Sequence, residues 1–138
     1  MKILVAVDGS KPSLKAVQVL IHHCHWYRES PQVELVTVHL PVPRVAKLPK
    51  GQLERYYLEE GQAMLAAAKK KLDAAGVQYT PHVLVGPVAE AIVKYAKDKR
   101  CDLIYIGSRG MSEIGKALVG STATKVLHIS DVPVLLVK

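Results

Sequence analysis

Phenylalanine is absent from this sequence of 138 residues, and aromatic residues make up only 5% of it. The two cysteines, Cys24 and Cys101, lie far apart and form no CxxC motif, which argues against a disulfide framework or a cysteine-based zinc site and predicts two buried or half-buried thiols. The longest apolar runs are strand-sized, far below the roughly 20 residues that a membrane span requires. The first residues also lack the charged, apolar and cleavage regions of a signal peptide. We therefore expect a cytoplasmic protein with no membrane contact.

The formal net charge of +7 raises the question of a nucleic-acid partner. The lysines are scattered over several predicted helices, however, and few aromatic residues accompany them. The only tight lysine run, residues 69–71, lies in an alanine-rich helix and is typical of a solvated helix face. We expect no nucleic-acid partner, and the positive charge helps to attract an anionic ligand.

The length fits one domain, which we assign to residues 1–138. Continuous apolar runs predict strands, and amphipathic segments with capping residues predict helices. The predicted strands cover residues 1–7, 33–40, 78–85, 103–106 and 132–137, and the predicted helices cover residues 11–27, 52–75, 88–99 and 121–129. This alternation predicts an α/β domain with a mostly parallel sheet and helices on both faces. Pro133 places the last strand at an edge, and the proline-rich segment 41–49 is predicted to be a loop and a candidate lid.

In open parallel sheets, ligands bind beyond the carboxyl ends of the strands. Two predicted strand ends carry suitable residues: residues 8–10 after the first strand, and residues 107–121, GSRGMSEIGKALVGS, after the fourth. The second segment nearly matches a P-loop, with Gly110 followed by Gly115 and Lys116, but Ala117 stands where a hydroxyl ligand of Mg²⁺ belongs. We therefore favour a wider frame of glycines at positions 107, 110 and 120.

In this wider frame, Gly107 and Gly110 let the backbone turn beside a ligand without a Cβ in the way, in conformations that include positive φ. Gly120 and Ser121 begin the last helix, whose free N–H groups and dipole favour a phosphate. A purely structural interpretation explains the same residues, because glycines make turns and Ser121 is suited to be an ordinary N-cap. The pattern alone leaves both interpretations open.

The frame Gly107-x-x-Gly110, nine residues, then Gly120-Ser121 resembles the nucleotide-binding signature of the universal stress protein family. The segments ILVAVDGS near the start, VGPVAEAIVKYAKDKRCDLIYIGSRG in the third quarter and VGSTATKVLHISDVPVLLVK at the end also resemble blocks of that family. This resemblance covers nearly the whole chain and implies the ATP-binding subgroup. It also implies a single-domain α/β fold of the adenine nucleotide alpha hydrolase-like kind, with an open twisted parallel five-stranded sheet in the order 3-2-1-4-5.

That strand order places the ends of the first and fourth strands side by side, so that both polar segments join one cleft. The resemblance implies a site there for ATP with Mg²⁺, built from Asp8, Val38, Gly107, Arg109, Gly110, Gly120, Ser121 and Thr122. Asp8 is expected near the sugar and phosphates, where it positions Mg²⁺ through water, and Val38 is expected to contact the adenine. Arg109 and the first two glycines are expected to line the ribose and phosphates, and the start of the last helix to hold the phosphate tail.

The resemblance further implies a stress-response protein that acts as an ATP-dependent regulatory or binding module, with an unidentified protein partner and a homodimer formed through the last strand. The alternative is a slow ATPase or autokinase in the same cleft, with Asp8 orienting metal or water and Ser121 accepting phosphate. The sequence contains no recognisable Ser/His/Asp or Cys/His arrangement, so we predict no catalytic residue. We assign no metal ligands, and we interpret His22 and His25, which share a helix face, as part of a polar helix end.

Overall fold

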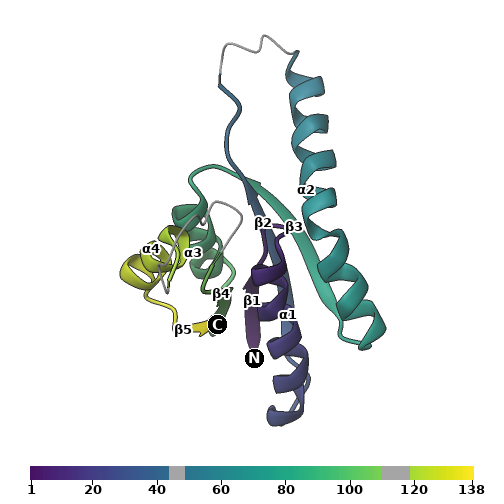
Figure 1. Ribbon diagram of the computed structural model, residues 1–138, viewed down its shortest axis with the longest axis vertical. Helices are drawn as coiled ribbons and strands as arrows, with labels where there is room; N and C mark the ends of the chain where they lie inside the picture. Colours follow the sequence, from purple (N-terminus) through teal and green to yellow (C-terminus); the bar gives the residue numbers. More distant parts are fainter. Residues whose placement is uncertain (44–48, 110–118) are drawn as a thin grey trace.

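The computed structural model describes residues 1–43, 49–109 and 119–138. Its strands are β1 (Lys2–Ala6), β2 (Gln32–His39), β3 (Tyr79–Val85), β4 (Leu103–Gly107) and β5 (Val134–Val137). Its helices are α1 (Lys11–His23), α2 (Lys50–Ala74), α3 (Val88–Asp98) and α4 (Ser121–Ile129), and a 3₁₀ turn, η1 (Cys24–Trp26), follows α1. Strands and helices alternate as the apolar pattern predicts (Figure 1).

The five strands form one parallel sheet in the order β3-β2-β1-β4-β5, which confirms the predicted order. Strand β1 lies at the centre and pairs with β2 on one side and with β4 on the other. The chain leaves β1 for α1 and leaves β4 towards α4, on opposite faces of the sheet. The carboxyl ends of β1 and β4 therefore mark the point where the connections diverge, which is where parallel α/β sheets bind ligands.

Successive side chains of the central strand are buried on opposite faces of the sheet. Ile3 and Val5 pack in one core with residues of α1 and α2, whereas Leu4 and Ala6 pack in a second core with residues of α3 and α4. Figure 1 shows α3 and α4 on one side of the sheet and α1 and α2 on the other. Because both faces are covered, β1 is continuously apolar after Lys2, as expected for a central parallel strand.

The first helix is shorter than predicted. Helix α1 ends at His23 rather than near Tyr27, and the chain tightens into η1. Tyr27 then has an extended backbone, and its hydroxyl lies 2.7 Å from the hydroxyl of Tyr105 in the core. This contact requires the chain to leave the helix direction, so tertiary packing overrides the helical apolar spacing.

The last strand begins at Val134 rather than at residue 132. The Ser130 hydroxyl donates to the Val132 carbonyl oxygen at 2.7 Å and accepts from the Val132 N–H at 3.1 Å, which forms a tight turn. Pro133 follows and supplies no N–H for pairing. Strand β5 lies at the edge of the sheet, as predicted.

The buried residues of helix α2 all lie from its middle onward. Its buried residues are Gly61, Leu65, Ala68 and Leu72, and Figure 1 shows its first half rising beyond the sheet. Gly61 brings the helix close to β3, because a Cβ at this position would lie 2.3 Å from the Val83 side chain.

The middle of the loop predicted over residues 41–49, residues 44–48, lies outside the described residues, and its described flanks contain neither helix nor strand. Cys101 is buried, Cys24 is half-buried, and both are free thiols, as predicted. None of the helices in the described part of the chain is long and apolar enough to cross a membrane.

Candidate ligand-binding site

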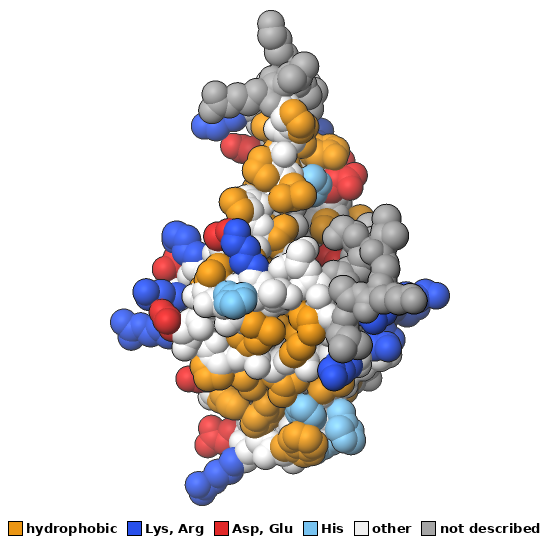
Figure 2. Space-filling model, turned by 60° about the vertical axis from the view of Figure 1, so that its left-hand side comes forward, with side chains coloured by type: hydrophobic (Ala, Val, Ile, Leu, Met, Phe, Trp, Pro, Cys, Tyr) orange, Lys and Arg blue, Asp and Glu red, His pale blue; other side chains and the backbone are white. Residues whose placement is uncertain are grey.

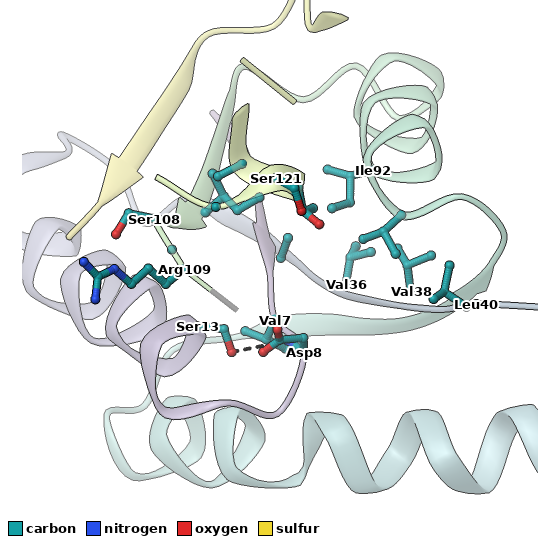
Figure 3. Close-up of a pocket in the computed structure, with 17 residues that line it drawn as sticks. Val7, Asp8, Ser13, Val36, Val38, Leu40, Ile92, Ser108, Arg109 and Ser121 are labelled. Carbon is teal, nitrogen blue, oxygen red and sulfur yellow. Dashed lines mark hydrogen bonds between the residues drawn. The ribbon is translucent and has the colours of Figure 1, made fainter. Parts of the chain in front are cut away.

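A pocket of about 220 Å³ opens at the carboxyl ends of β1 and β4 (Figure 3). One end is apolar, and its walls come from β2 and the residue after it and from α3: Val36, Val38, Leu40, Val88 and Ile92. The other end is polar and is formed by the segments that follow β1 and β4 and by the start of α4: Asp8, Ser13, Gly107, Ser108, Arg109, Gly120, Ser121 and Thr122. The pocket therefore suits a ligand with one apolar part and one polar or anionic part.

A closed set of hydrogen bonds orders the turn that carries Asp8. The Ser10 N–H donates to Asp8 Oδ1 at 2.9 Å, and the Asp8 N–H donates to the Ser13 hydroxyl at 3.2 Å. The same hydroxyl donates to the Ser10 carbonyl oxygen at 2.9 Å. Gly9 adopts a positive φ of 83°, which lets the chain turn sharply between β1 and α1. Asp8 is thus held at the pocket by the start of α1.

The start of α4 forms the opposite wall of the polar end. Gly120 is the N-cap residue, in an extended conformation, and Ser121 is the first helical residue. The interpretation of Ser121 as the N-cap is therefore wrong by one position. The first-turn residues Ser121, Thr122 and Ala123 line the pocket. Gly120 has no side chain that could cap the helix, and the first N–H groups of a helix have no intrahelical partner. Together with the helix dipole, these groups favour an anion at this place.

Ser108 ties this helix start to the sheet. Its carbonyl oxygen accepts the Gly120 N–H at 2.6 Å, and its own N–H donates to the Val137 carbonyl oxygen at 2.7 Å. The first turn of α4 is therefore positioned by the ends of both β4 and β5.

Gly107 is required for a reason different from the predicted one. It does not adopt positive φ, and it is the last residue of β4, paired with Val137. A Cβ here would lie 2.8 Å from the Pro12 carbonyl oxygen and 3.3 Å from Ser13 Cα. The glycine thus lets α1 approach the end of β4, and this approach brings Ser13 and Asp8 to the same pocket as Arg109.

Seven of the eight predicted site residues line this one pocket: Asp8, Val38, Gly107, Arg109, Gly120, Ser121 and Thr122. The eighth, Gly110, lies outside the described residues, as do Gly115 and Lys116 of the alternative P-loop frame. Figure 3 shows Arg109 at the opposite end of the pocket from Leu40, with its guanidinium directed away from the other labelled residues, and the side chain is exposed.

Sequence reasoning missed several residues of the pocket wall. Val36 and Leu40 are each two positions from Val38, and the alternation of strand side chains would have placed them on its face. Ser13 and Ser108 are buried hydroxyl residues, with 4% and 7% exposure. No sequence signal marks them, because serine is common near helix starts and strand ends.

The described residues contain no group of three or more His, Cys, Asp or Glu side chains that would hold a metal ion by themselves. Within residues 1–43, 49–109 and 119–138, Asp8 is the only acidic residue that lines the pocket. An ion pair between Glu90 of α3 and Lys125 of α4 braces the two helices beside the pocket. The hydrogen bond from Lys125 lowers the pKa of the Glu90 carboxyl.

A second polar cluster lies away from the pocket. The fully buried Tyr105 has its hydroxyl 2.7 Å from His23 Nδ1 and 2.7 Å from the Tyr27 hydroxyl. Burial, followed by the hydrogen bond with Tyr27, raises the pKa of Tyr105. Burial and the neighbouring His22 lower the pKa of His23. The cluster is satisfied internally and anchors the end of α1, which agrees with a structural role for these histidines.

Fold and pocket together define an α/β domain with a pocket at the switch point of an open parallel sheet. The universal stress protein family model matches residues 1–138, and the chain belongs to this family. The chain is 32% identical over 149 residues to the universal stress protein YxiE of Bacillus subtilis, covering 99% of this chain and 98% of that protein.

Solved structures give the same result. The structure of MJ0577, a universal stress protein of Methanocaldococcus jannaschii, superposes with a TM-score of 0.85 at 29% identity and covers 99% of this chain and 94% of that one. A universal stress protein in complex with cAMP superposes with a TM-score of 0.75 at 25% identity and covers 100% of this chain and 97% of that one.

Proposed function

We propose that this protein binds ATP in the pocket at the ends of β1 and β4 and acts as a nucleotide-dependent regulatory module of the stress response. The observation that carries the proposal is the division of the pocket into an apolar end and a polar end. An adenine ring matches the first, and a ribose with phosphates matches the second. The complex of a related universal stress protein with cAMP supports an adenine nucleotide as the ligand class.

Each end has a distinct task in this proposal. At the apolar end, the branched side chains of Val36, Val38 and Ile92 pack against the base, and nearby backbone groups provide its hydrogen bonds. At the polar end, the first turn of α4 receives the phosphates through its N–H groups, and the hydroxyls of Ser121 and Thr122 add contacts.

Asp8 fits a role with Mg²⁺. Its carboxylate lies at the end of the pocket assigned to the phosphates, where two negative groups would repel each other. Mg²⁺ is commonly held by one or two carboxylates together with phosphate oxygens and water. The single carboxylate of Asp8 therefore fits a cation that arrives with the nucleotide, and a bound Mg²⁺ would neutralise the phosphate charge.

Titration calorimetry on protein freed of carried-over nucleotide tests the proposal. We expect binding of ATP, AMP and cAMP, weaker binding of GTP, and tighter binding of ATP with Mg²⁺ than without it. Thr122→Ala should weaken ATP binding, whereas Thr124→Ala, an exposed position of the same helix outside the pocket, should leave it unchanged. Absence of adenine-nucleotide binding at millimolar concentration would overturn the proposal.

The proposal also includes a homodimer formed through β5. This strand pairs only with β4 in the described sheet, so its outer edge is available to a second copy. Light scattering should give twice the monomer mass. In the register with β4, the N–H of Leu136 faces the outer edge, so Leu136→Pro removes an edge donor without breaking a bond to β4 and should reduce the mass to that of the monomer. A monomeric wild-type protein would refute this part alone, because nucleotide binding is measured separately.

A further inference from the structure

The apolar end of the pocket continues past the sheet in a short stretch of chain, residues 39–43, which we call the rim segment. The paired register of β2 and β3 ends at His39 opposite Val85. Leu40 follows, lines the pocket, and is nevertheless 61% exposed. A ligand in the pocket would cover part of the Leu40 side chain. The position of the rim segment therefore affects the contact between Leu40 and the ligand.

Two local hydrogen bonds hold the beginning of the rim segment. The His39 carbonyl oxygen accepts the Gly86 N–H at 3.0 Å, which joins the rim segment to the turn before α3. The His39 ring donates from Nδ1 to the Leu40 carbonyl oxygen at 2.6 Å. The backbone after Leu40 has no strand partner in the described sheet, so contacts other than strand pairing must fix its position.

Helix α2, which lies outside the pocket, makes these contacts with the rim segment. The Tyr57 hydroxyl accepts the Val42 N–H at 2.8 Å. The His39 ring meets the Tyr57 ring edge to face, with centroids 5.2 Å apart, and meets the Tyr56 ring in the same manner at 5.6 Å. These spacings and angles are those of favourable aromatic pairs. Figure 2 shows hydrophobic side chains along this narrow upper part of the molecule.

Tyr57 is connected to the pocket although it does not line it. No described residue of α2 belongs to the pocket wall. The hydroxyl of Tyr57 holds the backbone two residues after Leu40, and its ring holds the residue before Leu40. The side chain at the rim is therefore fixed on both sides by one tyrosine of a helix that packs on the other face of the sheet.

We propose that Tyr57 is a positioning residue for the base of the bound nucleotide, acting through the rim segment and Leu40; this inference rests on the proposed function. The Tyr57 hydroxyl restricts the rim segment before the ligand arrives, which lowers the ordering cost of binding. It makes no contact with the phosphates, so its contribution is the same for ligands that share adenine and differ in phosphate.

The test replaces Tyr57 by phenylalanine and uses Tyr56→Phe as the matched control. Tyr56 is the neighbouring tyrosine and also contacts His39, but its hydroxyl makes no hydrogen bond with the described residues. Loss of one hydrogen bond to an accessible N–H predicts roughly two- to tenfold weaker binding of adenosine, AMP and ATP alike for Tyr57→Phe. Tyr56→Phe should bind as the wild type does, and both variants should melt close to the wild-type temperature.

Two further measurements separate positioning from general destabilisation. Amide hydrogen exchange at Val42 should be faster in Tyr57→Phe than in Tyr56→Phe, without ligand present. In a Leu40→Ala background, Tyr57→Phe should cause little additional loss of affinity, because the two residues act on the same contact.

Three results would refute the positioning role of Tyr57. Faster exchange at Val42 with unchanged affinity refutes the positioning role and leaves the proposed function intact. Equal loss of affinity in Tyr57→Phe and Tyr56→Phe, or fully additive losses with Leu40→Ala, also refutes it. If the wild type binds no adenine nucleotide, the proposed function fails and this inference fails with it.

Discussion

Replacing Gly120 by aspartate should stabilise the fold and weaken nucleotide binding at the same time. Gly120 is the N-cap of α4 and has φ of −73° and ψ of 165°, a conformation that aspartate adopts readily. An aspartate side chain here would accept hydrogen bonds from the same first-turn N–H groups that we assign to the phosphates. The substitution therefore places a fixed carboxylate where a mobile phosphate is expected to bind.

The two effects have estimable sizes. An aspartate N-cap is better than a glycine N-cap by a few tenths of a kcal/mol, and its charge near the helix N-terminus adds about 0.3–1 kcal/mol. We expect the melting temperature to rise by roughly 2–4 °C. A carboxylate about 5 Å from a phosphate charge, at an effective dielectric constant of about 20, costs about 3 kcal/mol. Screening by solvent reduces this, so we expect about ten- to hundredfold weaker binding of ATP.

Gly120→Asn is the matched control, because asparagine has the same shape and is also a good N-cap but carries no charge. Calorimetry with adenosine, cAMP, AMP and ATP separates the two effects. The difference between the aspartate and asparagine variants should be absent for adenosine and should grow with ligand charge. Without ligand, the melting temperatures of both variants should be equal to or higher than that of the wild type.

Equal binding of ATP by the aspartate and asparagine variants would contradict the assignment of the phosphates to α4. Equal affinities would mean that the phosphates lie away from the α4 start, even if the pocket binds adenine. A salt titration adds a check, since the penalty for the aspartate should shrink as ionic strength rises.

Two other predictions concern stability. Gly107→Ala should lower the free energy of unfolding by about 1–3 kcal/mol, because the new Cβ would lie 2.8 Å from a backbone oxygen of α1. Gly51→Ala, in α2, should raise the free energy of unfolding by about 0.5–1 kcal/mol, because no described atom lies within 4 Å of the new Cβ. Denaturant unfolding of both variants and the wild type measures these changes. The pKa of His23 is lowered in the folded state, so the unfolded chain binds a proton at this residue more readily than the folded chain does. The contribution of His23 to stability is therefore complete above pH 6.5 and is lost as the pH falls below that value. Melting curves from pH 8 to pH 5 should show this loss, and it should be smaller in His23→Gln; an unchanged pH profile in this variant would contradict the assignment.

The strand and helix order was predictable because each element carries its own periodicity. Strands β1, β4 and β5 are short runs of mostly apolar residues, and α1 and α3 begin after the signals Ser10 with Pro12 and Gly86 with Pro87. The end of α1 at His23 and the start of β5 at Val134 differ from prediction because they depend on side-chain contacts made after folding. Other boundaries differ from prediction by one or two residues. Strand order required the family resemblance, because periodicity does not specify which strands pair.

The polar end of the site was predictable in part because its residues follow directly after strands. Asp8, Gly107 and Arg109 all lie within three residues of a strand end. Tyr57 follows no such rule, since it lies in the middle of an amphipathic stretch and resembles any core-facing tyrosine. Its connection to Leu40 exists only because α2 and the end of β2 leave the sheet together, a property of the packed structure.

The capping residues explain why the phosphates are assigned to α4 and not to α1, although both helices begin at the pocket. The N-terminus of α1 is already occupied: the Ser10 hydroxyl accepts the Ser13 N–H at 3.3 Å, and the Asp8 carboxylate accepts the Ser10 N–H. An anion placed there would displace these bonds and meet the charge of Asp8. At α4, glycine stands where α1 has the capping hydroxyl of Ser10. The one acidic residue of the described pocket wall, Asp8, lies on the segment after β1. The contrast between Ser10 and Gly120 therefore supports our proposal that Asp8 lies on the cation side of a bound nucleotide and that α4 receives its phosphate oxygens.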